Sequence, residues 1–436
     1  MRRVRGFPDL IGVHAASFSH LQGVMSRVCK VFGCCEIQTP LVEQLALFQR
    51  AAPELEISKE LFQLTGKGEE ILALRPENTA GVLRAICESG VKSIPKSHPI
   101  RFFYSGPMFR YERPQKGRFR QFIQFGVEMI RESSHFSDVE GIDLAVQCLE
   151  EMGLRIQEDF CIEINSIGDL EARKSYCGRL KEYLQREPEL SRASRERLDQ
   201  NRILRILDSK EPQDHQIFRR EDFPKLFDFL SNESKQRFQQ VISELETLKI
   251  PVELNSNLVR GLDYYNDTVF EVVARNRAAE ILGIQQKTLL AGGRYDSLGE
   301  QLGYDSLPCF GWAAGIDRLY LVLNELGRLN ALQNDSSKVY VCLADFDQEI
   351  KSFALLLVSS LRRHSIQVAF DFDSSLKKQI SSANALGFDF AVLIGKEERQ
   401  KQEISLKNLK ESTQSSIPLS QDLTNLEQLL QALERN

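Results

Sequence analysis

Apolar positions in the first part of the chain follow the spacing of helices and strands in turn. From 137 to 153, apolar residues recur every three to four positions and Gly153 follows the last of them, which predicts an amphipathic helix. Ser137 and Glu140 have the spacing of a capping box, so we expect this helix to begin at Ser137. Residues 309–327, "CFGWAAGIDRLYLVLNELG", predict a short strand that continues into a helix closed by the final glycine.

The pattern changes between residues 169 and 246. Arg, Lys, Glu and Gln dominate this stretch, and its apolar positions fit helices with mixed-charge surfaces. Strand-like patterns return from about 251 to 290. We therefore interpret 169–246 as a helical insertion between the two parts of one domain, 1–168 and 247–327.

A polar linker, "GRLNALQNDSSK", precedes the C-terminal part of the chain. After it, the segments "VYVCLA", "IQVAFDF" and "FAVLIG" have the composition of strands, and helical patterns lie between them. Strands that alternate with helices are typical of parallel sheets. Residues 338–436 are therefore predicted to form a small, mostly parallel α/β domain.

Length and composition favour a soluble protein of several domains. A chain of 436 residues is too long for one compact core, so two or three domains are expected. Its 42% hydrophobic and 27% charged residues are typical of globular proteins. No stretch approaches the ~18 to 20 consecutive apolar residues of a membrane helix, and the start "MRRVRGFPDL" lacks the apolar centre of a signal peptide. We expect a cytoplasmic protein with no membrane attachment.

The cysteines and the net charge narrow the class further. Nine cysteines are scattered without a CxxC pair and the six histidines lie far apart, so we expect reduced, buried thiols and no metal held by protein ligands. The net charge of −5 argues against indiscriminate coating of nucleic acid, although a local basic face is still compatible with binding one.

No glycine-rich phosphate motif is present, since neither GxxxxGK[ST] nor GxGxxG occurs. Side chains must therefore hold any phosphorylated ligand. Residues 102–130 predict two antiparallel strands joined by "RPQKGR", and one face would carry Arg110 and Glu112 followed by Gln124 and Glu128. This face is either a solvated sheet surface with Arg/Glu pairs or a binding surface. The glycine at 126 favours the second, because it lets a ligand approach the backbone.

The segment "LVRGLDYYNDTVFEVV", residues 258–273, raises a similar question. Its β-branched and aromatic content predicts a strand, yet it also carries Arg260, two aspartates and two tyrosines. Such groups are rarely buried without partners, so they form salt bridges such as Arg260–Asp263 or hold a ligand. Strict alternation would place Tyr264 and Tyr265 on opposite faces of the strand.

Three of these segments resemble the class II aminoacyl-tRNA synthetases. "FRYE…RFRQF" resembles their motif 2, "GWAAGIDRLYLVL" their motif 3, and "LALRPENTA" their amino-acid-binding loop. "LVRGLDYYNDTVFE" and "AGGRYDSLGEQLG" resemble the two signature segments of the histidyl-tRNA synthetase family, and "SLKKQISSANALGFDFAVLIG" its anticodon-binding domain. The similarity extends almost from end to end.

The resemblance implies an α+β fold, in which an antiparallel sheet flanked by helices is interrupted by the helical insertion and followed by a C-terminal α/β anticodon-binding domain. It also implies a homodimer, because "VMSRVCKVFGCCEIQTPLVE" resembles motif 1, the interface segment, with Pro40 as its characteristic proline. Two departures are visible. Asn78 stands where many relatives have glycine, and residues 55–69 match the usual segment weakly.

The activity that the resemblance implies has two steps. L-Histidine and ATP, with Mg²⁺, give histidyl-adenylate and pyrophosphate, and the histidyl group then moves to the 3′ end of tRNA(His). Such phosphate chemistry needs cations, and arginine forks bind phosphate oxygens in pairs. The resemblance makes Arg110 and Arg260 the catalytic pair across the α-phosphate and places Arg318 on the γ-phosphate. The residues implied for ATP binding are Arg110, Glu112, Arg118 and Arg318.

A pocket selective for histidine needs a polar partner for each imidazole nitrogen and aromatic walls. The resemblance implies that Glu77, Thr79 and Gln124 surround the α-amino group and its polar neighbours. A site that bonds both nitrogens rejects analogues strongly, so no editing domain is required. The full set implied for histidine binding is Glu77, Thr79, Gln124, Glu128, Arg260, Tyr264, Tyr265 and Tyr295.

The tRNA would reach the site over the "RPQKGR" loop. By the same resemblance, Arg113 and Gln115 lie at the acceptor end, near the discriminator base. The helical insertion would clamp the acceptor arm through its arginines, or these form only a solvated helix surface. Those arginines are Arg179, Arg192, Arg195, Arg197, Arg202 and Arg205.

The main alternative is a catalytically silent relative that senses histidine and regulates histidine biosynthesis. Such relatives lose the RGLDYY-type segment, the phosphate-binding arginines or the anticodon domain, and this chain keeps all three. A third reading, an RNA-binding module without ATP chemistry, would lack Arg110 or Arg318. The sequence therefore favours the enzyme.

Overall fold

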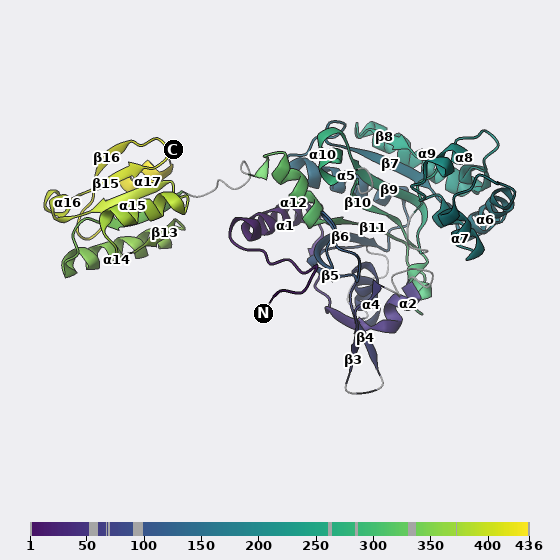
Figure 1. The fold of residues 1–436 in the computed structure, drawn as a ribbon, viewed down its shortest axis with the longest axis horizontal. Helices are drawn as coiled ribbons and strands as arrows, with labels where there is room; N and C mark the ends of the chain where they lie inside the picture. Colours follow the sequence, from purple (N-terminus) through teal and green to yellow (C-terminus); the bar gives the residue numbers. More distant parts are fainter. Residues whose placement is uncertain are drawn as a thin grey trace. The chain divides into compact units, whose positions relative to one another are not determined.

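The computed structural model describes residues 2–51, 60–66, 68, 70–89, 99–259, 264–283, 287–329, 337–371 and 373–434. The chain divides into two compact units, 1–332 and 333–436 (Figure 1). Each unit has hydrophobic cores of its own. No helix in the described ranges is long and apolar enough to cross a membrane.

The first unit is built on an antiparallel sheet, which confirms the predicted α+β class. Within the described residues the sheet has eight strands. Each of the two edge strands is parallel to its neighbour, β1 to β5 and β8 to β7, and the other pairs are antiparallel. In spatial order the strands are β1 (Cys35–Glu36), β5 (Ile100–Phe109), β6 (Gln121–Ile130), β11 (Cys309–Gly315), β10 (Thr288–Arg294), β9 (Asn266–Ala274), β7 (Phe160–Ser166) and β8 (Val252–Leu254).

One face of this sheet is covered by helices. Alternate residues of β6, namely Phe125, Val127 and Met129, point into a core shared with these helices. Gln124 and Glu128 therefore face the other way, toward the pocket described below. The covering helices are α1 (Val13–Val31), α5 (His135–Glu151), α10 (Asn276–Leu282) and α12 (Ile316–Glu325), and a short helix α11 (Leu298–Gln301) follows β10.

A smaller sheet carries the loop that lines the pocket. Among the described residues its strands are β2 (Val42–Gln44), β4 (Ile71–Leu74) and β3 (Gln63–Thr65), with β4 between the other two. Helix α2 (Leu45–Ala51) packs against helix α4 (Thr79–Ser89). The chain passes from β4 into α4 through residues 75–78, so this loop is held at both ends.

Residues 170–247 contain helices and no strand in the structure (Figure 1). Asp169, Ser191 and Ser231 each accept a hydrogen bond from a backbone N–H at a helix start, which is the usual role of an N-cap. The elements are α6 (Leu170–Gln185), α7 (Arg192–Asp199), η1 (Leu204–Ile206), α8 (Pro212–Phe218), η2 (Leu226–Phe229) and α9 (Asn232–Thr247).

Helix α5 begins earlier than its sequence pattern predicts. The cap is Ser134, whose hydroxyl accepts from Phe136 N, and not Ser137. Ser137 instead donates to the Ser134 carbonyl at 2.7 Å, and Glu140 pairs with Arg101 at 2.6 Å. The predicted capping box is therefore wrong, because an earlier serine supplies the cap.

The second unit has a mixed sheet in the order β13-β12-β14-β15-β16. The three predicted strands are parallel, as expected, but an antiparallel hairpin of β15 and β16 extends the sheet. This hairpin was not predicted from the sequence, although Ile404 and Leu406 alternate with polar residues in β15. The elements are β12 (Lys338–Leu343), α14 (Gln348–Arg363), β13 (Gln367–Phe370), α15 (Leu376–Ala385), β14 (Phe390–Ile394), α16 (Lys396–Lys401), β15 (Glu403–Asn408), β16 (Gln414–Pro418) and α17 (Leu426–Glu434).

Candidate active site

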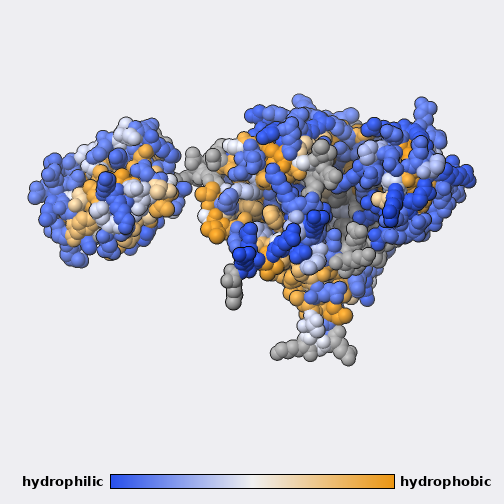
Figure 2. Space-filling view, in the orientation of Figure 1, coloured by the Kyte–Doolittle hydropathy of each residue, from blue (hydrophilic) through white to orange (hydrophobic). Residues whose placement is uncertain are grey.

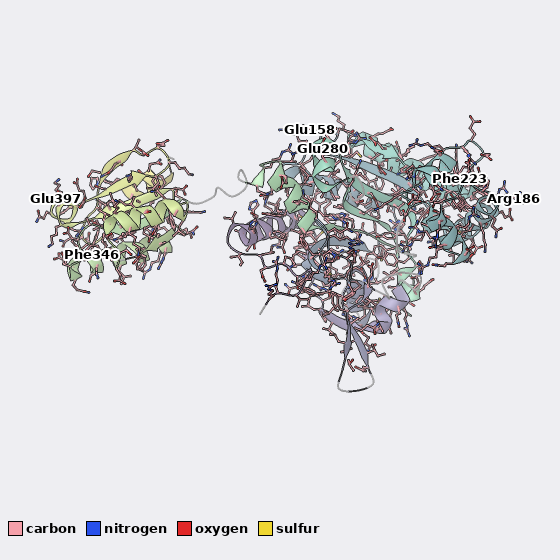
Figure 3. All side chains as sticks on the ribbon, in the orientation of Figure 1. Glu158, Arg186, Phe223, Glu280, Phe346 and Glu397 are labelled. Atoms are coloured by element: carbon pink, nitrogen blue, oxygen red, sulfur yellow. The ribbon has the colours of Figure 1, made fainter. Side chains whose placement is uncertain are left out.

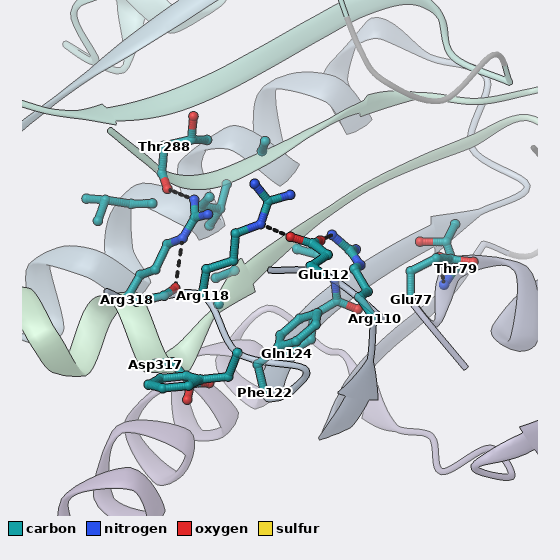
Figure 4. Close-up of a pocket in the computed structure, with 18 of the residues that line it drawn as sticks. Glu77, Thr79, Arg110, Glu112, Arg118, Phe122, Gln124, Thr288, Asp317 and Arg318 are labelled. Atoms are coloured by element: carbon teal, nitrogen blue, oxygen red, sulfur yellow. Dashed lines mark hydrogen bonds and ion pairs between the residues drawn. The ribbon is translucent and has the colours of Figure 1, made fainter. Parts of the chain in front are cut away.

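A pocket of about 240 Å³ lies in the first unit on the sheet face opposite the covering helices (Figure 4). Strands β6, β10 and β11 supply its floor, and the segment after β5 supplies one wall. Nine residues expected at the site line it: Glu77, Thr79, Arg110, Glu112, Arg118, Gln124, Tyr264, Tyr265 and Arg318. The structure thus brings together side chains that are up to 241 positions apart in the chain.

Three arginines lie along the pocket, with Arg318 and Arg118 at one end and Arg110 next to them toward the middle (Figure 4). Arg318 donates to the Thr288 carbonyl at 2.8 Å. Arg118 forms an ion pair with Glu112, which lies 4.0 Å from Arg110. Burial lowers the pKa of the Arg318 guanidinium, and the charges of Arg118 and Arg110 lower it further. These three guanidinium groups outnumber the two carboxylates near them, Glu112 and Glu271, so this part of the pocket suits an anionic ligand.

Arg110 occupies the middle of the pocket. Its Nε donates to the Pro76 carbonyl at 2.9 Å, and its guanidinium carbon lies 5.2 Å from the centre of the Phe122 ring. The sequence pattern predicted that Arg110 and Glu112 lie on the first strand of the hairpin. Strand β5 ends at Phe109, so both residues follow the strand instead. They face the same pocket because the chain there is fixed by these contacts.

Asp317 is a pocket residue that sequence reasoning missed. Strand β11 pairs with β6 only as far as Gly315 opposite Gln124, and the next residue of β6, Ile123, donates its N–H to Asp317 Oδ2 at 2.8 Å. The side chain thus replaces a missing strand partner and fixes the first turn of α12. Burial raises the pKa of Asp317 to about 6. An aspartate inside the apolar run "AAGIDRLYLVL" was the available signal, because a buried carboxylate needs a donor.

The far end of the pocket begins at the loop between β4 and α4. The Glu77 carboxylate accepts from the backbone N–H groups of Thr79 at 2.6 Å and Ala80 at 3.2 Å, in the first turn of α4. Helix N-termini favour negative charge. Burial nevertheless raises the pKa of Glu77, and these hydrogen bonds oppose that increase. Glu77 is therefore an acceptor held in place by the helix.

The unusual Asn78 anchors this loop. Its Oδ1 accepts from the Thr39 hydroxyl at 2.5 Å and from Arg75 Nη1 at 3.3 Å. Arg75 also donates to the Pro107 carbonyl at 3.1 Å, at the end of β5. The departure from glycine therefore adds an attachment between the loop and the sheet.

Glu128 lies behind the pocket lining and is almost fully buried, at 1% exposure. It accepts hydrogen bonds from the Thr79 hydroxyl at 2.7 Å and from the Tyr295 hydroxyl. Burial raises the pKa of Glu128 to about 8. Glu128 and Tyr295 are thus adjacent, but neither belongs to the pocket surface in this structure.

Tyr264 and Tyr265 both line the pocket, so the prediction that they lie on opposite faces is wrong. Strand β9 begins only at Asn266, and strict alternation does not apply before it. Their ring centres are 4.9 Å apart, and that of Tyr264 is 5.7 Å from that of Tyr295. Arg260, the second expected catalytic residue, lies outside the described residues.

The position of Gly126 in β6 suggested that it lets a ligand approach the backbone, but the structure gives this glycine another role. A Cβ at this position would collide with the hydroxyl and ring of Tyr104. The glycine therefore makes room for a buried tyrosine, whose hydroxyl lies 3.4 Å from Gln124 Oε1.

Arg113 and Gln115 are exposed and lie outside the pocket lining. Gln115 and Arg118 exchange two backbone hydrogen bonds of 3.0 Å, which closes a tight turn between them. This turn holds Arg118 toward the pocket while Gln115 stays on the surface. No cluster of three or more potential metal ligands occurs in the described ranges.

Comparisons with known proteins agree with this geometry. A family model described as histidyl-tRNA synthetase matches residues 6–319, and one described as an anticodon binding domain matches 338–429. A histidine–tRNA ligase from Prochlorococcus marinus is 38% identical over 431 residues, which are 97% of this chain and 95% of the relative. One from Geobacillus kaustophilus is 36% identical over 422 residues, 96% of each chain.

The solved structures give the same answer. The crystal structure of apo S. aureus histidyl-tRNA synthetase matches with a TM-score of 0.77 and 29% identity, and the match covers 100% of both chains. The family models cover nearly all of this chain, and the relatives match it at similar length. This chain belongs to the histidyl-tRNA synthetase family.

Proposed function

We propose that this protein is a histidine–tRNA ligase. It activates L-histidine with ATP to histidyl-adenylate and pyrophosphate, and it then transfers the histidyl group to the 3′ end of tRNA(His). The observation that carries this proposal is the pocket itself, which joins three arginines to a buried chamber of carboxylates and tyrosines.

ATP binds at the arginine end. Arg110, in the middle of the pocket, holds the α-phosphate and the substrate carboxylate, and Arg260 faces it across the α-phosphate. Arg318 binds the γ-phosphate, while Arg118 and Glu112 support the nucleotide. Bidentate guanidinium groups place charge where it develops in the transition state, and positioning of this kind dominates phosphoryl chemistry.

Histidine binds at the opposite end. Glu77 and Thr79 meet the α-amino group, with Gln124 beside them. Glu128 and the tyrosine cluster Tyr264, Tyr265 and Tyr295 surround the imidazole. The side chain of Thr79 already bonds Glu128, so one short network joins the two parts of the histidine pocket.

Magnesium accompanies the triphosphate. Mg²⁺ prefers carboxylate oxygens and phosphates, and two carboxylates lie near the phosphate end. Glu112 lines the pocket, and Glu271 accepts from the Thr288 hydroxyl at 3.0 Å and raises the pKa of nearby Arg318. These two side chains fit the ion, which would neutralise phosphate charge when bound.

The tRNA contacts three parts of the chain. Arg113 and Gln115 meet the acceptor end near the discriminator base, and the C-terminal unit, 338–436, binds the anticodon. The helical insertion, 169–246, clamps the acceptor arm. It contains a groove of about 440 Å³ lined by the basic residues Arg173, Lys174, Lys181, Arg202 and Arg205.

The protein acts as a homodimer in the cytoplasm. Leu41 and Val42, beside Pro40 in the segment like motif 1, are 42% and 37% exposed, and Val31 is 80% exposed. Apolar side chains gathered at one segment are typical of a subunit interface. Sedimentation velocity of the Leu41→Glu variant tests the assignment, since a charge in the interface would yield monomers.

The decisive experiment is histidine-dependent exchange of labelled pyrophosphate into ATP, with each other amino acid tested in turn. Arg260→His is the matched variant. Exchange with histidine alone, lost in this variant, supports adenylate formation. Histidine binding without exchange would favour the histidine-sensing alternative, which the arginine end makes the weaker one.

A second experiment tests the acceptor-end assignment. If Gln115 reads the discriminator base, exchanging that base changes the kinetics of wild type more than those of Gln115→Ala. An equal factor in the two proteins rejects the role of Gln115 and leaves the reaction itself untouched.

A further inference from the structure

The N-terminal segment of residues 2–7 is attached to the start of β6. The Gly6 carbonyl accepts from Arg120 N at 2.9 Å and from Gln121 N at 3.2 Å. Gly6 has φ +90°, and a Cβ there would lie 2.9 Å from Arg120 Cγ. A side chain at position 6 would therefore be strained and crowded. The segment is docked at the end of the "RPQKGR" loop.

Phe7 fixes the same segment on its other side. Its ring lies 5.8 Å from that of Phe62 and 6.5 Å from that of Phe109, the last residue of β5. Its N–H donates to the Val4 carbonyl at 3.2 Å, which closes a turn. The segment is therefore held against both strands that flank the loop. These attachments fix the point from which the residues before Gly6 extend.

Those residues are strongly cationic. Arg2, Arg3 and Arg5 are exposed, and the structure gives no ion pair to any of them within the described residues. The neighbouring loop adds Arg113 and Lys116, both exposed. In a chain of net charge −5 this is a local concentration of positive charge. Figure 2 shows a group of strongly hydrophilic residues beside the N-terminal end, with apolar residues next to it.

An aromatic side chain interrupts this surface. Tyr111 is 54% exposed, and the Arg120 guanidinium carbon lies 4.0 Å from its ring centre. Basic groups interleaved with an exposed ring suit a single-stranded nucleic acid, because the arginines bind phosphates and the ring stacks on a base. A protein partner of acidic character would use the charges but not this ring.

We propose that the N-terminal arm, residues Arg2 to Gly6, binds the phosphate backbone at the acceptor end of the tRNA. The inference rests on the proposed function, which brings the 3′ end of the tRNA into the adjacent pocket. Gly6 holds the arm at Arg120 and Gln121, which directly follow the loop that carries Arg113 and Gln115. The arm supplies affinity without reading sequence, since phosphate contacts position a nucleic acid and base contacts select it.

The test compares R2Q/R3Q/R5Q with the control R27Q/R155Q/R277Q. The control arginines have side chains 62%, 68% and 67% exposed, and each pairs with a glutamate. Figure 3 labels Glu158 and Glu280, the partners of Arg155 and Arg277, at the edge of the first unit away from the N-terminus. Pyrophosphate exchange should be unchanged in both variants.

Aminoacylation should separate them. In the arm variant we expect the KM for tRNA to rise about 10-fold, and the slope of log KM against log salt to fall by about 2, as for two or three lost phosphate contacts. R2K/R3K/R5K should restore both values, because lysine also binds phosphate. A minihelix made of the acceptor stem alone should report the same loss.

Three outcomes overturn the inference. The arm variant could match the control in KM and salt slope, or its loss could vanish with the minihelix, or the lysine variant could fail to restore the KM. Failure of the proposed function looks different, because wild type itself would then charge no tRNA.

Discussion

The two ends of the pocket differ in burial and in the kind of polar group that they carry. At the phosphate end, Arg110 and Arg118 have side chains 30% and 39% exposed, and they are held by one backbone carbonyl and one carboxylate. At the histidine end, Glu128, Tyr264 and Tyr295 are each 1% exposed and are held mainly by one another.

This difference separates two tasks within one cavity. Charged groups that keep contact with water can bind a polyphosphate and release pyrophosphate. A buried network of hydroxyls and a carboxyl pays a penalty for any unsatisfied group, so it discriminates between ligands of similar size. Binding strength and selectivity are therefore assigned to different ends, and variants should affect them separately.

The largest effect should come from Arg110, the arginine of the phosphate end that lies nearest the histidine end. Arg110→Ala should lower the kcat/KM of pyrophosphate exchange by about 10³, because it removes charge from the α-phosphate in the transition state. Steady-state exchange measures this loss. Arg155→Ala, an exposed arginine far from the pocket, should retain wild-type exchange. A KM effect without any loss of kcat would contradict a role in the transition state.

Glu128→Gln should raise the KM for histidine by about 100-fold and leave the KM for ATP unchanged, since a buried polar partner is lost. Tyr295→Phe should act in the same direction more weakly. Exchange at varied histidine and fixed ATP provides the measurement. Equal increases in the KM values for histidine and ATP would contradict the assignment of the two substrates to different ends of the pocket.

Arg318→Gln should weaken the binding of ATP and leave the binding of histidine unchanged. We expect the KM for ATP to rise roughly 10- to 30-fold, as for one lost charge-assisted hydrogen bond, while the KM for histidine stays unchanged. Calorimetry with a non-hydrolysable ATP analogue is an independent check. If the affinity for the nucleotide is unaltered, Arg318 does not bind the γ-phosphate.

Asp317→Ala should raise the KM for ATP about 5-fold by loosening the first turn of α12 next to Arg318. Asp317→Asn keeps an acceptor for the Ile123 N–H, so it should restore most of the affinity. If asparagine and alanine behave alike, the hydrogen bond does not position Arg318.

The smallest effect concerns stability and pH. The pKa of Glu128 rises from 4.5 to about 8 on folding, so the folded state binds this proton more tightly than the unfolded state. The stability that this group contributes is therefore complete below pH 4.5 and is lost as the pH rises toward 8. Thermal unfolding of Glu128→Gln should depend less on pH across this window than that of wild type.

Motifs with local chemistry were predictable from the sequence, and features set by distant neighbours were not. The ends of β11 and α12 follow from an apolar run closed by Gly327, which has φ +70°. The purpose of Gly126 depends on Tyr104 of the adjacent strand, which no pattern within β6 reveals. The common face of the two tyrosines depends on where β9 begins.

The same limit applies to the phosphate end. Arg110 and Arg318 carried a recognisable pattern, because arginine is rarely placed beside apolar runs without a partner. Asp317 also stood out in its apolar run, but its partner could not be predicted, since Ile123 N is left without a strand partner only because the pairing of β6 with β11 stops at Gly315. Periodicity describes a strand but not the point at which its neighbour leaves it.

The pairing of β6 with β11 also sets an order of events during synthesis. Strand β6 ends at Ile130 and its partner begins at Cys309, about 180 residues later. At ~5 to 20 residues per second a ribosome needs roughly 10 to 35 s to supply that partner. Meanwhile the helices of residues 170–247, which rely on nearby contacts, can fold. The β5–β6 hairpin must therefore wait with an unpaired edge, and the pocket is completed only when the last strand of its sheet emerges.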